Sequence, residues 1–323
     1  VLNADGTPGA RNDANCVSVE HKLGIHASPT AVMVYEKAVG YLVGEENKGL
    51  SYMFIMMNAA RFSVGLEGVA IAERPFQRAL AYAKGRMQGR DLIEGKTVPI
   101  IRHPDVRRML MLMKSQTEAM RALAYVTAAA LDFANKSKSE KHQAFVELMI
   151  PVVKGWSTET GIEVASLGVQ IHGGMGFIEE TGAAQYLRDA RITTIYEGTT
   201  GIQAMDLVGR KIARDGGRTV KAWLDEVRKF PQMEAGVRAV SDCVDFITAS
   251  KDPRATFAGA VPFLKLMGIV AGGWQMARAA AAAEKAKGGD KAFYEAKIAT
   301  ARFYMDHVLV QAPGLRDTVV KGS

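Results

Sequence analysis

The chain has 323 residues, 48% hydrophobic and 23% charged, a balance typical of a globular protein with one large or two ordinary domains and not of a disordered chain. Its two cysteines, Cys16 and Cys243, are too few for a disulfide framework, and no Cys/His cluster has zinc spacing, so we expect two buried free thiols in a reducing compartment and no metal. The net charge of +7 permits an anionic partner, but no run of five like charges or aromatic-interleaved basic patch indicates nucleic-acid binding.

The first residues are polar and carry no charged-then-apolar signal sequence. Because the chain starts at Val1 and not at Met, we expect a fragment or a domain of a longer protein. The longest apolar stretches, Ala260–Leu264 and Leu266–Trp274, are separated by Lys265. Both are shorter than the ~20 residues of a membrane span, so no span is expected.

Residues 1–50 are predicted to be the end of a β region. Two short β-prone runs, Cys16–Glu20 and Ala31–Tyr35, are separated by Gly, Pro, Asn and Asp residues that favour turns. Since two short strands do not make a stable sheet alone, we expect the other strands of this sheet to lie outside the chain.

From about Gly49 onward the pattern is helical. Apolar residues keep to one helical face between 105 and 135, and Asp105 after Pro104 supplies an acidic first turn. Residues 51–85 and 140–156 are also predicted helices, and each contains a proline. Because proline removes a backbone donor and clashes with the preceding turn, we expect kinks near Pro75 and Pro151.

One more helix is predicted from Thr199 to about Ala213, ending at Gly216 and Gly217. Three or four further helices are then predicted between 218 and 318, at Val220–Arg228, Gly236–Ala249, Val261–Lys287 and Asp290–Gln311. The expected fold class is mainly α, a helical bundle preceded by a remnant of a β domain and followed by an appended C-terminal helical layer. The expected boundaries are 1–48, 49–215 and 216–323.

The stretch from Gln170 to Ile212 carries the residues best suited to chemistry. A Gly-rich turn with Gly173, Gly174 and Gly176 follows a predicted helix and lets the backbone approach a ligand closely. After a short amphipathic helix and the β-branched run Ile192–Tyr196, Glu197 lies just before a helix start, where unpaired N–H groups point outward. Ordinary structural roles are also open, because Gly-Gly often caps a helix end and Glu often caps a helix start.

Together these residues resemble the acyl-CoA dehydrogenase family. The segments QIHGGMGF, LRDARI and IYEGTTGIQ are similar to the C-terminal signature of that family. EHKLGIHASPTAVMVY and GEENKGL resemble the last strands of its middle β domain, and MMNAARFSVG resembles the first helix of its C-terminal domain. The remainder resembles the additional helical domain of a long bacterial branch, whose members act on methylthio-propionyl-CoA and on fatty acyl-CoAs.

The resemblance implies an FAD-dependent oxidation of acyl-CoA to trans-2-enoyl-CoA in fatty acid β-oxidation, with electrons passing to an electron-transfer flavoprotein. Glu197 matches the base that removes the α-proton, and its own N–H matches a donor to the developing enolate oxygen. The residues that match flavin-binding positions, several of them across a subunit boundary, are Arg86, Gln170, Gly173, Gly174 and Thr199. Tyr196 and Gly198 match substrate-binding positions.

Other matches carry no catalytic role. Arg61 resembles a structural arginine beneath the active site, and His172 matches no catalytic position. Gly201 stands where many relatives have Gln or Glu. Met87 and Gln88 stand where relatives more usually have a segment that contains an aromatic residue. A homodimer or homotetramer in the cytoplasm is implied. Because the N-terminal helical domain and the first strands of the middle domain are missing, we expect the chain alone to hold FAD poorly and to be inactive.

Several alternatives are open. A branch of the same superfamily consists of basic DNA-binding flavoproteins, and a non-catalytic oligomerisation fragment is also compatible with the sequence. Acyl-CoA oxidases differ only in using oxygen as the acceptor. Nitroalkane oxidases use Asp as the base, so Glu197 argues against them. Acyl chain length is left open.

Overall fold

The computed structural model describes residues 1–286 and 288–322. They divide into two compact units, Val1–Asn58 and Ala59–Ser323, which are described separately. Most of the chain is helical, which confirms the mainly α fold class expected from the sequence. The predicted division at 48 and 215 stays a prediction, because the second unit contains both the expected bundle and the expected appended layer.

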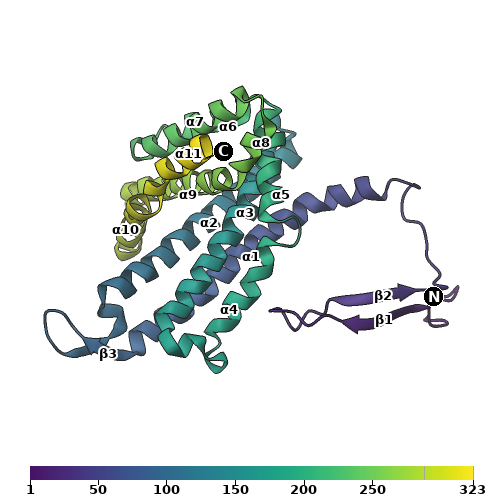
Figure 1. Cartoon of the computed structure of the whole chain (residues 1–323), viewed down its shortest axis with the longest axis horizontal. Helices are drawn as coiled ribbons and strands as arrows, with labels where there is room; N and C mark the ends of the chain where they lie inside the picture. Colours follow the sequence, from purple (N-terminus) through teal and green to yellow (C-terminus); the bar gives the residue numbers. More distant parts are fainter. Residues whose placement is uncertain (287, 323) are drawn as a thin grey trace. The chain divides into compact units, whose positions relative to one another are not determined.

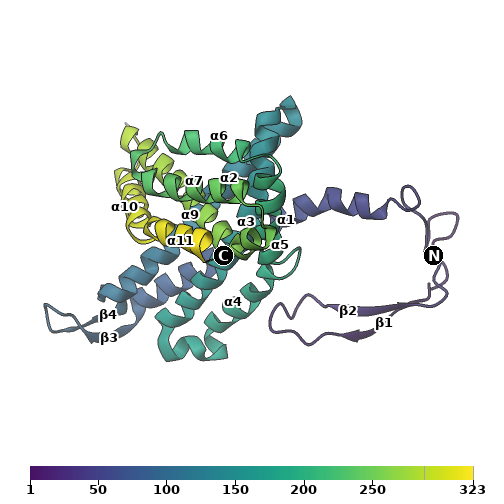
Figure 2. The same cartoon turned by 45° about the horizontal axis from the view of Figure 1, so that its top comes forward.

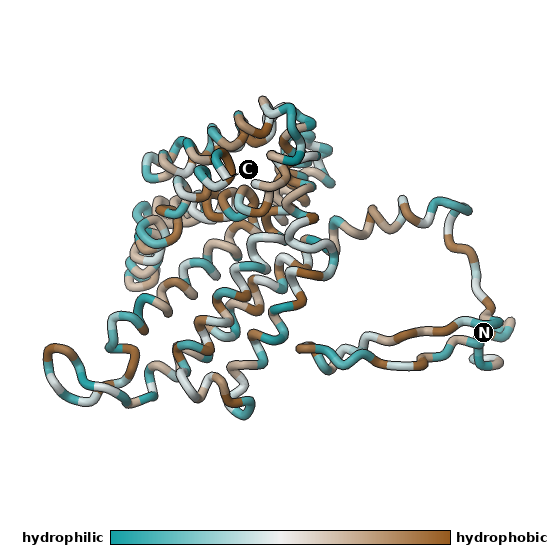
Figure 3. Tube along the Cα trace, viewed as in Figure 1, coloured by the Kyte–Doolittle hydropathy of each residue, from teal (hydrophilic) through white to brown (hydrophobic). Residues whose placement is uncertain are grey.

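The first unit contains an antiparallel hairpin of β1 (Ala14–Val19) and β2 (Ala31–Tyr35), both close to the predicted runs. The pairing aligns Ala14 with Tyr35 and has an irregularity between Cys16 and Ser18. Cys16 is exposed, so the expectation of a buried thiol is wrong for this residue, whereas Cys243 is buried. Apolar side chains on both strands are exposed, and the hydrophobic segments of the hairpin are visible in Figure 3. Within the first unit these side chains therefore have no covering layer, as the sequence led us to expect of two isolated strands.

The bundle of the second unit consists of long helices that lie side by side (Figures 1 and 2). Its first helix enters from the first unit. The elements are α1 (Gly49–Gly85), β3 (Met87–Arg90), β4 (Thr97–Pro99), α2 (Pro104–Ser137), α3 (Glu140–His172), α4 (Ala183–Ala190) and α5 (Thr200–Met205), with a π-helical segment at Asp206–Ala213. Short 3-10 turns are η1 (Ile100–Arg102), η2 (Gly173–Phe177), η3 (Glu179–Thr181) and η4 (Arg191–Thr194).

The internal prolines do not end their helices. α1 continues through Pro75, and α3 continues through Pro151 to His172, so one helix spans both the predicted helix 140–156 and the predicted helix that ends before Gly173. Pro75 is buried, and a Cβ added at Gly168 of α3 would lie 3.1 Å from its Cβ. Close packing between the two helices therefore stabilises the segment where a backbone hydrogen bond is lost. The kinks themselves stay predictions.

The appended layer has more helices than the three or four predicted. In its described residues it contains α6 (Arg218–Val227), α7 (Glu234–Ala249), α8 (Pro253–Ala258), α9 (Ala260–Lys285), α10 (Lys291–His307) and α11 (Ala312–Lys321), with turns η6 (Pro231–Met233) and η7 (Leu309–Gln311). The prediction failed at α8, which is too short to show a period, and at α11, which η7 separates from α10. The predicted helix end at Lys287 lies outside the described residues.

One hydrophobic core joins the bundle to this layer. Trp156 of α3 packs with Met267 and Val270 of α9 in a single cluster of buried side chains. The contact is so close that a Cβ added at Gly268 would lie 2.0 Å from Trp156 Cγ. The indole thus occupies space that any larger residue at position 268 would need.

Among the described residues, α1 has the length and the apolar composition that a membrane-crossing helix needs. Only uninterrupted apolar runs were considered in the sequence, so this helix was not identified as a candidate span. Such a helix is weak evidence of a span. Arg61 forms an ion pair with Asp206 at 3.6 Å, with side chains 11% and 10% exposed, and Glu67 accepts a hydrogen bond from the Tyr196 hydroxyl. Its charged groups therefore contact protein, which favours a bundle helix.

Candidate functional site

A sharp loop between η4 and α5 carries the predicted base. Glu197 and Gly198 both adopt left-handed backbones, with φ of 53° and 91°. Such a conformation costs a non-glycine residue about 1 kcal/mol or more. Thr199 then caps α5, because its Oγ1 accepts a hydrogen bond from Ile202 N at 3.3 Å. Since Thr199 is the helix cap, the ordinary capping role considered for Glu197 is wrong.

The Glu197 side chain is partly buried. Among the residues that the structure describes, its carboxylate has neither a hydrogen-bond partner nor an ion-pair partner. The main chain of the loop is held more firmly, because Gly198 O accepts from Lys154 Nζ at 2.7 Å. A longer contact joins Gln203 Nε2 to Glu197 O at 3.4 Å. The carboxylate is consequently free to contact a bound molecule.

A layer of charged side chains lies beneath this loop. Lys154 is fully buried, and burial lowers its pKa to about 8, against the opposing effect of the Glu159 carboxylate. Glu159 accepts a hydrogen bond from Thr200 Oγ1 at 2.6 Å. Arg61, interpreted as structural from the sequence, lies in this layer with its partner Asp206. The loop therefore lies above buried Lys154 and the largely buried Arg61–Asp206 pair, whereas Glu159 is exposed.

Tyr196 precedes the base and links the loop to α1. Its hydroxyl donates a hydrogen bond to Glu67 Oε2. Burial raises the pKa of this phenol, and the hydrogen bond to Glu67 raises it further, so the phenol stays protonated.

Gly201 lies in α5, and a Cβ there would meet only Thr199 Oγ1, at 3.8 Å. A larger side chain would therefore fit at position 201, so steric crowding does not explain why glycine stands here in place of the Gln or Glu of the family pattern.

The remaining predicted cofactor residues lie at the opposite end of α3. The Tyr82 and His172 rings stack at 4.4 Å, which brings the end of α1, and with it Arg86, to the end of α3. Gly173 caps α3 with φ of 60°, and its N–H donates to Gln170 O, so the capping role is confirmed for this glycine. A Cβ added at Gly173 or Gly174 would meet no described atom within 4 Å. This turn thus presents bare backbone to open space.

Two neighbours in this signature act within the fold. His172 is buried, its Nδ1 lies 2.7 Å from Gly168 O, and burial lowers its pKa, which fits the non-catalytic role expected. Gly176 was expected to allow close approach of a ligand. A Cβ there would lie 2.3 Å from Val169 O, so the glycine accommodates the chain's own backbone, and the expectation is wrong for this residue.

The two groups of predicted residues are far apart. Lys154, below the Glu197 loop, and His172, beside the Gly173 turn, are separated along α3 by roughly five turns, or about 27 Å. The structure therefore does not bring Arg86, Gln170, Gly173 and Gly174 together with Glu197 within one chain.

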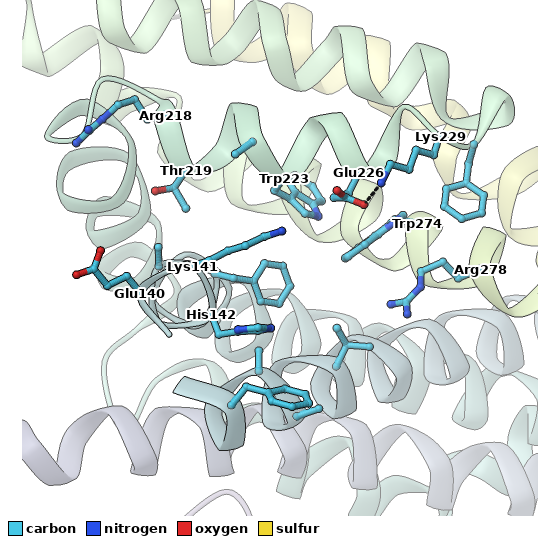
Figure 4. A pocket seen from close by; sticks show the side chains of 18 residues that line it. Glu140, Lys141, His142, Arg218, Thr219, Trp223, Glu226, Lys229, Trp274 and Arg278 are labelled. Atoms are coloured by element: carbon cyan, nitrogen blue, oxygen red, sulfur yellow. Dashed lines mark hydrogen bonds and ion pairs between the residues drawn. The ribbon is translucent and has the colours of Figure 1, made fainter. Parts of the chain in front are cut away.

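A further pocket lies elsewhere and has no counterpart in the sequence motifs. It has a volume of about 970 Å³ and lies among α2, α3, α6 and α9 (Figure 4). Its apolar side chains include Trp223 and Trp274, and the Arg278 guanidinium lies 5.2 Å from the Trp274 ring. No predicted site residue lines it, so its size does not identify it with the site at Glu197.

Within residues 1–286 and 288–322, no three His, Cys, Asp or Glu residues gather as a metal site.

Comparison with known proteins gives consistent results along the whole chain. Residues 47–212 match the family "Acyl-CoA dehydrogenase, C-terminal domain", and residues 216–323 match "Acetyl-CoA dehydrogenase C-terminal like". The 3-methylmercaptopropionyl-CoA dehydrogenase of Ruegeria pomeroyi is 53% identical over 331 residues, covering 95% of this chain and 56% of that relative.

Two further similarities are more distant. The broad-specificity linear acyl-CoA dehydrogenase FadE5 of Mycobacterium tuberculosis is 34% identical, covering 97% of this chain and 58% of that relative. An acyl-CoA dehydrogenase complexed with FAD from Bacillus anthracis has a similar fold, with a TM-score of 0.79 at 21% identity, covering 95% of this chain and 56% of that structure. The chain thus spans little more than half the length of these relatives.

Proposed function

Because the chain belongs to the acyl-CoA dehydrogenase family, we propose that it carries the proton-abstracting part of the active site of such an enzyme, with Glu197 as the base. The main support is the Glu197 carboxylate, which lies partly buried on a left-handed loop without a partner among the described residues. A carboxylate in a fixed position and free of an ion pair is suited to remove a proton from a bound molecule.

The residues of the chain also fit the implied cofactor. The Gly173–Gly174 turn offers open backbone, and exposed Arg86 at the same end supplies a positive charge for a pyrophosphate. When bound, FAD supplies the acceptor for the β-hydrogen of the substrate, and the electrons pass on to an electron-transfer flavoprotein.

The chain's own part in the reaction is to move one proton and to stabilise the charge that forms. The Glu197 carboxylate takes the α-proton of the thioester, and the Glu197 N–H donates to the developing enolate oxygen. In this arrangement Tyr196 and Gly198, which flank the base, would line the acyl side, and Thr199, which caps α5, would contact the bound flavin.

We further propose that two copies of the chain share each flavin, in a homodimer or homotetramer. The support is the distance of about 27 Å along α3 between the two groups of residues, which leaves Arg86, Gln170, Gly173 and Gly174 to meet the adenosine part held by another copy. The chain alone would then hold FAD poorly and be inactive, which flavin absorbance of the purified chain would measure.

The substrate is proposed to be a short acyl-CoA. The 53% identity to a 3-methylmercaptopropionyl-CoA dehydrogenase makes that thioester the first compound to test. A cytoplasmic location, a role in fatty acid β-oxidation and the three-part domain division at 48 and 215 belong to the same proposal.

The test is to replace Glu197 with Gln in the FAD-loaded enzyme that contains this chain. We expect anaerobic bleaching of the flavin by 3-methylmercaptopropionyl-CoA to slow by roughly 10²–10⁴-fold, because the amide accepts no proton, while FAD is retained. Glu180→Gln, an exposed carboxylate in the same signature region, is the control and should bleach at the normal rate. Normal bleaching by the Glu197 variant would contradict the assignment of the base.

A further inference from the structure

One lysine lies directly beneath the loop that carries Glu197. Lys154, in the middle of α3, is 0% exposed. Its Nζ donates hydrogen bonds to Thr193 O at 2.9 Å and to Gly198 O at 2.7 Å. One ammonium group therefore joins the end of η4 to the residue after the proposed base.

Burial of this ammonium is costly and calls for an explanation. Lysine is almost never fully buried without a partner, and an apolar residue of similar length would fill the space without the cost of desolvation. Among the described residues Lys154 has no ion pair within 4.0 Å, and its two hydrogen-bond partners are both main-chain carbonyls of the loop. Its contacts thus serve the loop and not a neighbouring carboxylate.

A second buried side chain supports the same loop. Gln203, in the first turns of α5, is 0% exposed, and its Nε2 lies 3.4 Å from Glu197 O. A Cβ added at Gly198 would lie 2.7 Å from that same nitrogen. Both carbonyls of the left-handed pair are therefore contacted from inside the protein. Because the conformation at Glu197 is intrinsically unfavourable, contacts of this kind are what maintain it.

We propose that Lys154 is a positioning residue for the reaction: by fixing the Thr193 and Gly198 carbonyls it holds Glu197 in its left-handed conformation, and so sets the direction of the carboxylate and of the Glu197 N–H. The inference rests on the proposed function of Glu197. A displacement of about 1 Å at a reacting group can lower a rate by on the order of 10²-fold, so such a tether affects catalysis more than binding.

The experiment uses the FAD-loaded enzyme and two substitutions, Lys154→Met and Lys154→Gln. Methionine removes both hydrogen bonds and the charge, whereas glutamine keeps an N–H donor. The measurements are the single-turnover rate of flavin reduction by 3-methylmercaptopropionyl-CoA, the apparent dissociation constant of that thioester, and the exchange of its α-proton with deuterated solvent. The first and third report on proton removal, and the second reports on binding.

We expect Lys154→Met to reduce flavin and to exchange the α-proton about 10–100-fold more slowly, with the dissociation constant changed by less than about threefold. Lys154→Gln should recover part of the rate. Thr158→Val is the matched control, because Thr158 is buried one turn further along α3 and its hydroxyl bonds only to carbonyls of its own helix. Its rate should equal that of the parent.

Other results would overturn the inference. They are a normal rate in Lys154→Met, a loss confined to thioester binding, or an equal loss in Thr158→Val. Should the methionine variant fail to fold, the glutamine variant decides, and a parental rate there rejects the role. Glu197→Gln separates the two claims. A normal rate of flavin reduction in Glu197→Gln rejects the proposed function. If Glu197→Gln loses flavin reduction but Lys154→Met reduces flavin at the normal rate, only the positioning role of Lys154 is rejected.

Discussion

A left-handed backbone at two consecutive residues determines the direction in which the proposed base points. Glycine adopts this conformation without steric cost, whereas Glu197 does so against its preference. The neighbours that oppose this cost are Lys154 and Gln203 below the loop and Thr199 after it. At this scale, stability and the proposed chemistry depend on the same few atoms.

Gly198→Ala should destabilise the chain by about 1–2 kcal/mol, because φ of 91° is unfavourable for alanine and the new Cβ would lie 2.7 Å from Gln203 Nε2. Urea denaturation followed by circular dichroism measures this. Gly201→Ala, three residues away in α5 and with open space for a Cβ, is the control and should be neutral or stabilising. Equal stabilities of the two variants would count against a strained loop.

The buried Lys154 predicts a specific dependence of stability on pH. Its pKa in the fold is about 8, below its ordinary value of 10.5. Between these values the unfolded chain binds more protons, so the lysine's contribution to folding stability rises with pH. Between about pH 7 and about pH 9.5 the parent should gain on the order of 2 kcal/mol relative to Lys154→Met.

Paired urea denaturation curves of the two proteins test this shift. The comparison removes the effect of groups common to both, such as Cys243, whose thiol pKa burial raises to about 12. A parent that gains no stability over the variant in this range would show that Lys154 titrates as an exposed lysine does.

At the scale of elements, close approach between α3 and α9 depends on glycine. Gly268→Ala should destabilise the chain by roughly 3 kcal/mol, because the new Cβ would overlap Trp156, the centre of the contact. Gly314→Ala, in α11 with no described atom within 4 Å of the new Cβ, should leave stability equal or higher. Thermal denaturation compares them, and an unchanged midpoint for the Gly268 variant would mean that the helices separate freely.

The sequence predicted the elements whose signals are local. The β-prone run Ala31–Tyr35 and the apolar period between 105 and 135 were sufficient for β2 and α2. The strand β3 at Met87–Arg90 was missed because it lacks β-branched residues, and α8 because six residues are less than two turns.

The site was predictable to the same extent. Glu197 and Thr199 follow from a contiguous motif, but the separation from Gly173 depends on the three-dimensional path of α3. Lys154 left a signal that was not used, because it is the one charged residue in the apolar run Met149–Trp156. A charge at such a position indicates a buried polar contact. Which carbonyls it contacts follows only from the fold.

At the scale of the whole molecule, the bundle and the appended layer behave as one folding unit. The two family matches meet near residues 212 and 216, yet Trp156 and Met120 on one side share a core with Met267 and Val270 on the other. A sequence boundary between domains is therefore not a boundary of the hydrophobic core.

Removal of residues 216–323 should abolish cooperative unfolding, because the apolar face of α2 and α3 would be exposed to water. Removal of residues 1–46, before α1, should shift the melting temperature of the helical unit by less than about 3 °C. Calorimetry of both truncated chains checks this. A sharp transition in the chain ending at Asp215 would show that the bundle is independent.

The indole of Trp156 and the missing side chain at Gly268 have an evolutionary consequence. The two positions share a single volume, so neither is free to mutate alone. A lineage that replaces the tryptophan with a small residue gains room for a larger one at 268, and a lineage that keeps the ring must keep the glycine. Among descendants of a common ancestor, these two positions should change as a correlated pair although more than a hundred residues of chain separate them.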